Sequence, residues 1–155
     1  MTTLDNPYLT ALDKNWIAQA ELLKTKSLDP NRKVGCLFVK ENVKLAEGYN
    51  HLPLINLPSS RLLDQSLKNM SIIHAEVAAV ADAANRGVST KGCSAFITCH
   101  PCSSCANVLI SAGVRKIVCP NFRGYFGSWA ESFRVASDDL YNSGITVLYY
   151  SDLSQ

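Results

Sequence analysis

Apolar and polar residues alternate along the first third of the chain in two patterns. Residues 9–26 carry apolar side chains at near-helical spacing, which predicts an amphipathic helix. The turn-forming sequence SLDPN follows. After it, KVGCLFVKENVKLAEGYN contains two apolar runs around a polar turn at Glu41–Asn42. This second pattern is typical of a β-hairpin.

The rest of the chain alternates between helical and extended patterns. HAEVAAVADAANRG is alanine-rich and ends in glycine, as a helix with its C-cap does. Strands are predicted for CSAFITC, VRKIVCP and ITVLYY, and helices for CSSCANVLISAG and WAESFRVASDDLYNSG. The insert HLPLINLPSSRLLDQSLKNM contains two prolines and is expected to be a loop with a short helix at residues 60–69.

This order of elements predicts the fold class. The succession α-β-β-α-β-α-β-α-β favours a three-layer α/β/α sandwich around a five-stranded mixed sheet. Neither an internal repeat nor a low-complexity tract nor a linker divides the sequence, so residues 1–155 are expected to form a single domain.

Composition and charge narrow the class of partner. Hydrophobic residues make up 47% and charged residues 18% of the 155 residues, as in a globular protein. Positive and negative charges nearly balance, and a net charge of +2 is too small to favour a nucleic-acid partner. The sequence lacks the plan of a signal peptide and an apolar run of about 18 residues, so we expect a cytoplasmic protein without a membrane partner. Six cysteines in a reducing compartment suggest metal or catalytic use.

The candidate chemistry lies at two predicted helix starts. His74 opens the alanine-rich helix, and Cys102 and Cys105 occupy the first turn of the helix after a buried strand. Helix N-termini favour thiolates, and two adjacent helix starts could bring one imidazole and two thiolates together. Three protein ligands leave a fourth tetrahedral position for water, as in a catalytic zinc site, where the pKa of water falls to about 7.

Glu76 is the candidate catalytic residue of this site. It follows the ligand His74 by two positions at the same helix start. A carboxylate there can lie beside a metal-bound water without ligating the ion. It could then take the proton of that water and pass it on, which is general acid–base catalysis.

The cysteine spacing also permits other interpretations. Cys99, Cys102 and Cys105 form C-x2-C-x2-C, but a ferredoxin cluster would need a fourth cysteine where Leu109 stands. A redox pair or half of a structural zinc knuckle stays open as well. Cys99 is expected to pack as a small hydrophobe at the end of a strand, and His100 to be a loop residue near the site. Core positions are expected for the remaining cysteines, Cys36, Cys93 and Cys119.

His74-Ala75-Glu76 followed by Pro101-Cys102-Ser103-Ser104-Cys105 resembles the zinc-dependent nucleobase deaminase superfamily. Three further segments, KSLDPNRKVGCLFV, EGYNHLP and CANVLISAGVRKIV, are similar to the deoxycytidylate (dCMP) deaminase family. The similarity covers roughly residues 16–148. It implies a cytidine deaminase-like fold and one Zn²⁺ per subunit.

The implied reaction is dCMP and water to dUMP and ammonia, which feeds dTMP synthesis. Glu76 would deliver a proton to N3 of the base and later to the departing amine. The family resemblance also implies a homo-oligomer, with a hexamer favoured. A deoxynucleoside triphosphate effector is a further candidate partner, although His51 stands where the family often has glycine. Open alternatives are a deaminase of 5-substituted dCMP or another nucleobase or nucleoside, a tRNA adenosine deaminase-like enzyme, and a silent zinc scaffold.

Further residues are expected to contact the substrate on the same grounds. Asn50, the asparagine after G-Y, would hydrogen-bond the sugar, and Lys26, where the family commonly has arginine, would bind the 5′-phosphate. Arg123 and Tyr125 are candidates for the phosphate or the base, and Phe126 or Trp129 is expected to pack that loop onto the core. Ala75, between the ligand and the acid, completes the substrate-binding set.

Overall fold

The computed structural model describes residues 6–53, 59–122 and 127–151, and within them the predicted order of helices and strands is confirmed. The insert adds a short 3-10 helix, η1, before helix α2. The elements are α1 (Ala11–Lys24), β1 (Gly35–Lys40), β2 (Val43–Tyr49), η1 (Ser59–Leu62), α2 (Gln65–Ser71), α3 (Ala75–Asn85), β3 (Ser94–Ile97), α4 (Ser103–Ser111), β4 (Lys116–Pro120), α5 (Ala130–Asn142) and β5 (Thr146–Tyr150).

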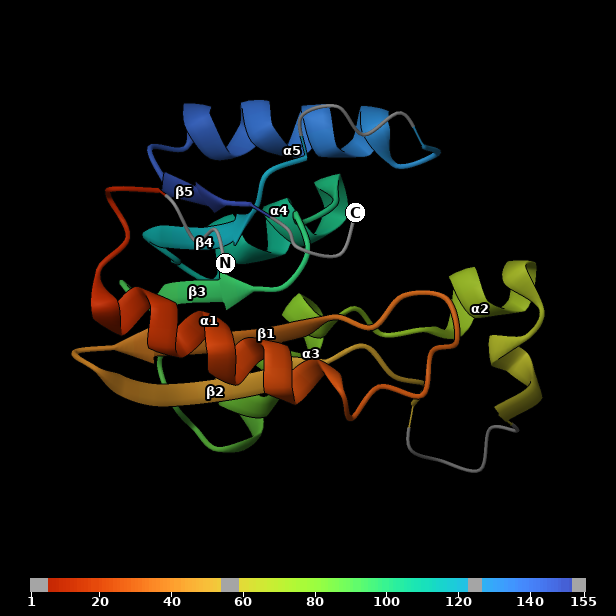
Figure 1. Cartoon of the computed structure of the whole chain (residues 1–155). Coiled ribbons are helices and arrows are strands. Elements are labelled where there is room, and N and C mark those ends of the chain that lie inside the picture. The colour runs from red at the N-terminus through yellow and green to blue at the C-terminus, as the bar shows by residue number, and fades with distance from the viewer. Residues whose placement is uncertain (1–5, 54–58, 123–126, 152–155) are drawn as a thin grey trace.

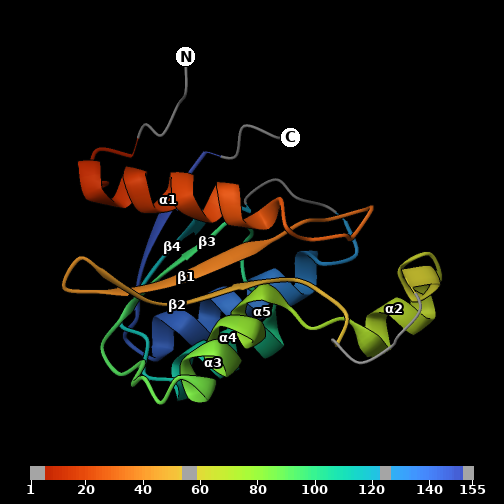
Figure 2. The ribbon, with the colours of Figure 1, turned by 90° about the horizontal axis from the view of Figure 1, so that it is seen from below.

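The strands form one mixed sheet in the order β2-β1-β3-β4-β5. Strand β1 runs antiparallel to both β2 and β3, whereas β3, β4 and β5 are parallel to one another. Figure 2 shows α1 on one face of this sheet and α3, α4 and α5 on the other. The predicted three-layer α/β/α sandwich with a five-stranded mixed sheet is therefore confirmed.

Alternating side chains of β1 supply both layers of the core. Leu37 and Val39 belong to the cluster under α1, while Cys36 and Phe38 belong to the cluster under the other helices. This period-2 pattern explains why β1 is buried along nearly its whole length. None of the helices in the described part of the chain has the length and apolar character needed to span a bilayer.

The insert between β2 and α3 stands beside the sandwich. In Figure 1, α2 lies to one side of the sheet rather than over either face. A buried ion pair joins it to the main body, with Lys68 Nζ 2.8 Å from Asp29 Oδ1. An isolated β-bridge between His51 and Ile73 joins the two ends of the insert. The insert is thus attached next to the place where α3 begins.

Candidate metal centre and active site

One imidazole and two sulfurs meet where α3 and α4 begin. His74 is the N-cap of α3 and Cys102 is the N-cap of α4, but neither side chain caps its own helix. Nδ1 of His74 lies 3.3 Å from Sγ of Cys105 and 3.7 Å from Sγ of Cys102. The three candidate ligand atoms lie within 4.8 Å of one another. The predicted meeting of these residues is what the structure shows.

This donor set fits a zinc ion. With Zn–S near 2.3 Å and Zn–N near 2.0 Å, a tetrahedral ion separates a nitrogen ligand from a sulfur ligand by about 3.5 Å. The two separations of 3.3 and 3.7 Å in this chain lie on either side of that value. Imidazole with thiolates is also a ligand combination that zinc prefers. His74, Cys102 and Cys105 could therefore hold the ion and leave a fourth position open.

The electrostatics of the cluster favour a thiolate at Cys102. The hydrogen bond from the Cys105 thiol, helped by the His74 ring, lowers the pKa of Cys102 to about 4. The same hydrogen bond, together with burial, raises the pKa of Cys105. The bond to Cys102 also raises the pKa of His74. The positive ends of two helix dipoles point at the cluster and stabilise negative charge there as well.

Glu76 lies in the first turn of α3, beside the cluster. Its side chain is only 4% exposed and lines the same pocket as His74 and Cys102. Burial raises the pKa of its carboxyl above the ordinary value of 4.5. A carboxyl with a raised pKa exchanges protons more readily near neutral pH, as a general acid–base group must. The placement agrees with the role predicted for Glu76.

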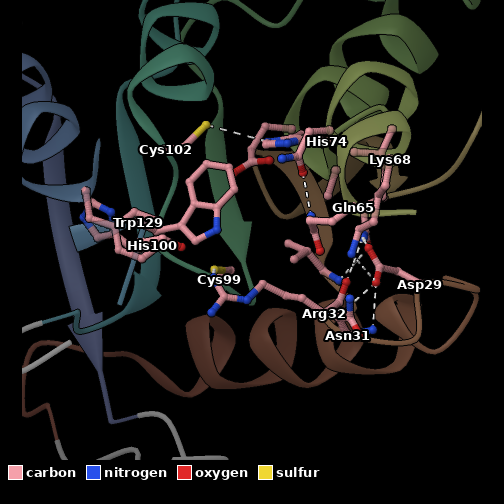
Figure 3. A pocket seen from close by; sticks show the side chains of 18 residues that line it. Asp29, Asn31, Arg32, Gln65, Lys68, His74, Cys99, His100, Cys102 and Trp129 are labelled. Atoms are coloured by element: carbon pink, nitrogen blue, oxygen red, sulfur yellow. Dashed lines mark hydrogen bonds and ion pairs between the residues drawn. The ribbon is translucent and has the colours of Figure 1, made fainter. Parts of the chain in front are cut away.

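His74 and Cys102 of the cluster line one end of a pocket of about 290 Å³. Figure 3 shows His74, Cys102, Cys99 and Trp129 around this end. The opposite end is polar, and its lining consists of Asp29, Asn31, Arg32, Asn50, Gln65, Lys68 and Asn69. The volume lies near the lower limit for small-molecule sites, which suits a ligand of a few tens of atoms. Such a ligand would place a reacting group at one end and polar groups at the other.

The substrate-contact predictions have different outcomes. Ala75 and Asn50 line the pocket, but the amide of Asn50 already bonds the backbone of Val34 and Arg32. Lys26 is not part of the pocket lining, and its exposed ammonium pairs with Glu47 at 3.3 Å. The remaining two candidates, Arg123 and Tyr125, lie outside the described residues.

The other cysteines and His100 lie largely where they were expected. Cys36, Cys93 and Cys119 are fully buried. Cys99 does not belong to the metal-ligand cluster, but it is half-buried, lines the pocket and lies 3.8 Å from the Arg32 guanidinium. It packs against the buried cluster of Cys102, Cys105 and Phe133, as expected, and lines the pocket as well. His100 follows β3 in a loop near the site and is buried against the rings of Phe122, Phe133 and Tyr149.

Phe126 or Trp129 was expected to pack its loop onto the core. Phe126 lies outside the described residues, and the side chain of Trp129 is 37% exposed and lines the pocket. Its ring contacts the His74 ring edge to face, with 6.0 Å between centroids, and stacks on Phe133. The residue just before α5 thus forms an aromatic wall next to the metal cluster, because α5 packs against α4 at this end.

Sequence reasoning missed the contribution of the insert. Gln65, Lys68 and Asn69 of α2 all line the pocket, and Lys68 is buried. The available signal was their spacing, since positions i, i+3 and i+4 share one helix face. A short helix was predicted for residues 60–69, but the prediction did not say that its polar face would line the pocket.

Comparison with known proteins places the chain in a family. Residues 10–120 match the family model described as the cytidine and deoxycytidylate deaminase zinc-binding region. Because the match covers well over half of the chain, the protein belongs to this family, and it is a hydrolase of the deaminase class. The resemblance carried by H-A-E and P-C-x-x-C is thereby confirmed.

Individual relatives are similar over different lengths. An uncharacterised deaminase encoded in the luxG 3′ region of Aliivibrio fischeri is 28% identical over 88% of this chain and 91% of its own length. Human deoxycytidylate deaminase is 34% identical over 66% of this chain, which spans only 61% of that enzyme.

Solved structures show the same architecture. The dCMP deaminase of cyanophage S-TIM5, solved in complex with dCMP and dUMP, aligns with a TM-score of 0.78 at 26% identity. The alignment covers 92% of this chain and 99% of that protein. The sandwich and the position of its sheet are therefore those of a dCMP deaminase structure.

Proposed function

We propose that this protein catalyses the zinc-dependent hydrolytic deamination of dCMP to dUMP and ammonia. The observation that carries the proposal is the buried carboxyl of Glu76 beside the His74, Cys102 and Cys105 cluster at one end of a pocket of nucleotide size. The choice of dCMP as substrate is supported by the similarity to a human deoxycytidylate deaminase and to a cyanophage dCMP deaminase. Membership of a zinc-binding family supports the choice of metal.

The residues of the chain divide the chemistry between them. His74, Cys102 and Cys105 would hold one zinc ion, which when bound lowers the pKa of a water molecule and makes it nucleophilic at neutral pH. Glu76 accepts the proton that is released and donates it to N3 of the pyrimidine, then assists the departure of the amine at C4. Its burial keeps bulk water from competing for this proton.

Aromatic and polar walls orient the substrate. Trp129 and Phe133 stack on each other at the metal end of the pocket, where a flat pyrimidine ring can lie against them. Asn50 and Asn31 lie at the polar end, where a sugar and its phosphate would extend. The base is therefore held with C4 toward the cluster.

The biological setting belongs to the same proposal. An enzyme that makes dUMP supplies the precursor of dTMP, and the family resemblance favours a cytoplasmic homo-oligomer with one zinc ion in each subunit. A net charge of +2 gives no support to a tRNA substrate.

A substrate panel tests the proposal. The zinc-loaded protein is incubated with dCMP, 5-methyl-dCMP, dCTP, deoxycytidine, cytidine, cytosine and guanine, and loss of the amine is followed by ultraviolet absorbance. We expect the highest kcat/KM with dCMP or its 5-substituted form. Turnover of a free base or nucleoside, with dCMP left untouched, would discard the nucleotide assignment.

A further inference from the structure

We infer that the ammonium of Lys68, on the insert helix α2, receives the 5′-phosphate of the substrate. The inference rests on the proposed function, which supplies a nucleoside monophosphate as the ligand. It replaces Lys26 as the phosphate cation, because Lys68 lines the pocket and Lys26 does not.

Lys68 is unusual in being a buried lysine in a short helix beside the sandwich. It is only 7% exposed, although lysine is rarely buried without a partner, and it lines the pocket. An ammonium has three N–H donors. Within the described residues, the acceptor recorded for this ammonium is Asp29 Oδ1, at 2.8 Å. Two donors are therefore available to a ligand in the pocket.

The carboxylate of Asp29 balances the charge of Lys68 but takes up only one of its N–H donors. Its oxygens accept hydrogen bonds from Lys68, from the backbone N–H groups of Asn31 and Arg32, and from the amide of Asn50. Three of these donors bond Oδ1 and the amide of Asn50 bonds Oδ2, so both oxygens of Asp29 are engaged by the protein. Its role is to hold Lys68 in place. The guanidinium of Arg32 also belongs to the pocket lining, but it reaches away from Lys68 and lies 3.8 Å from the sulfur of Cys99.

The neighbours of Lys68 are also suited to an anion. Gln65 and Asn69 share its helix face and line the same pocket. Gln65 donates to the side-chain oxygen of Asn69 at 2.7 Å, which leaves the amide hydrogens of Asn69 for another acceptor. Figure 3 shows Lys68 and Gln65 on the opposite side of the pocket from Cys102 and Trp129. A nucleotide with its base at the metal would extend its phosphate toward this helix face.

The experiment compares the binding of dUMP and deoxyuridine, which differ only in the phosphate. Calorimetric titrations are made on the zinc-loaded protein, on Lys68→Met and on Lys116→Met. Lys116 is a matched control, because it pairs with the buried Asp13 at 2.6 Å and does not line the pocket. We expect Lys68→Met to lose about ten- to a hundredfold in dUMP affinity and to leave deoxyuridine affinity unchanged. Lys116→Met should retain the preference for dUMP.

Two results would overturn the inference. Lys68→Met could retain the wild-type ratio of dUMP to deoxyuridine affinity, or it could weaken both ligands equally, as a purely structural role requires. If Lys68→Met does not fold, the double variant Lys68→Met/Asp29→Asn removes both charges of the ion pair. Its affinities for dUMP and deoxyuridine are then compared in the same way. A wild type that binds dUMP through Lys68 but deaminates no cytosine compound would contradict the proposed function and leave the phosphate site standing.

Discussion

His74 and Cys102 each occupy a helix N-cap, a position where a side chain usually bonds the free backbone N–H groups. Neither does so here. Their side chains turn toward one another, and the positive ends of α3 and α4 are directed at the cluster, although the N–H of Ser103 in α4 bonds the hydroxyl of Ser132. The use of two N-caps as ligands thus brings the donor atoms together and favours the thiolate that a metal requires.

The first prediction separates Cys99 from its two neighbours in the same motif. Cys102→Ala and Cys105→Ala each remove one of three ligands and should reduce zinc content to near zero after gel filtration. Cys99→Ala should keep close to one zinc ion per chain, because Cys99 lies outside the cluster. Metal analysis checks all three variants. Equal loss of zinc from Cys99→Ala, or retention of zinc by Cys105→Ala, would contradict the assigned ligand set.

The site residues that could be predicted from the sequence are those that lie close together along the chain. His74, Glu76, Cys102 and Cys105 were predictable because two short motifs hold them, each at a helix start. Lys68, Trp129 and Arg32 reach the pocket only through tertiary packing. The direction of the α2 face decides the position of Lys68, and the packing of α5 on α4 decides that of Trp129; neither follows from local spacing.

At the scale of elements, the approach of α3 to β2 determines where His74 and Glu76 lie. A Cβ at Gly48 in β2 would lie 2.3 Å from the backbone N of Ala79 and 2.4 Å from the backbone O of Ala75. The helix can therefore lie directly on the strand only because residue 48 lacks a side chain.

The second prediction follows from this contact. Gly48→Ala should force α3 away from β2, lower the free energy of unfolding by roughly 1–3 kcal/mol or more, and reduce zinc affinity because His74 moves with the helix. Gly87→Ala, at the far end of α3, is the control. Its added Cβ meets nothing within 4 Å, and its positive φ of 64° should cost only about 1 kcal/mol without loss of zinc. Denaturation and metal titration test both. Unchanged zinc affinity in Gly48→Ala would contradict this account.

The elements themselves were largely predictable, since their apolar periodicity is strong. Even the turn at Glu41–Asn42 was placed correctly, although it lacks glycine and both residues adopt positive φ of 50° and 58°. Asn tolerates this conformation, and the Asn42 side chain is held by a hydrogen bond from Trp16. The insert was the exception, because its two prolines and weak periodicity do not show that α2 would be tied back by a buried ion pair.

At the scale of the whole molecule, two buried carboxylates join segments that are distant in sequence. Asp13 of α1 pairs with Lys116 of β4, and Asp29 pairs with Lys68 of the insert. Burial alone would raise the pKa of each carboxyl, but the ammonium partners and further hydrogen bonds outweigh it and hold both pKa values below the ordinary 3.8. Both pairs thus stabilise the folded chain while the carboxylates are ionised.

The third prediction is the resulting pH dependence. A carboxyl whose folded-state pKa lies below its unfolded value stabilises the protein fully above the unfolded value, and this stability is lost as the pH falls through the folded pKa. The free energy of unfolding should therefore decrease as the pH drops below about 4. Asp13→Asn should be less stable than the wild type at pH 7, and the difference should narrow in acid. Urea denaturation at several pH values measures this. A constant difference from neutral to acidic pH would contradict the lowered pKa of Asp13.

The most direct test of the whole account is the rate of dUMP formation by zinc-loaded wild type and Glu76→Gln. The substitution keeps the size of the side chain and removes its ability to carry a proton. We predict equal zinc content and equal thermal stability within about 1 kcal/mol, with kcat for dCMP lower by at least about a hundredfold. If the Glu76→Gln variant carries zinc and deaminates dCMP at the wild-type rate, then Glu76 does not transfer the proton and the proposed active site is wrong.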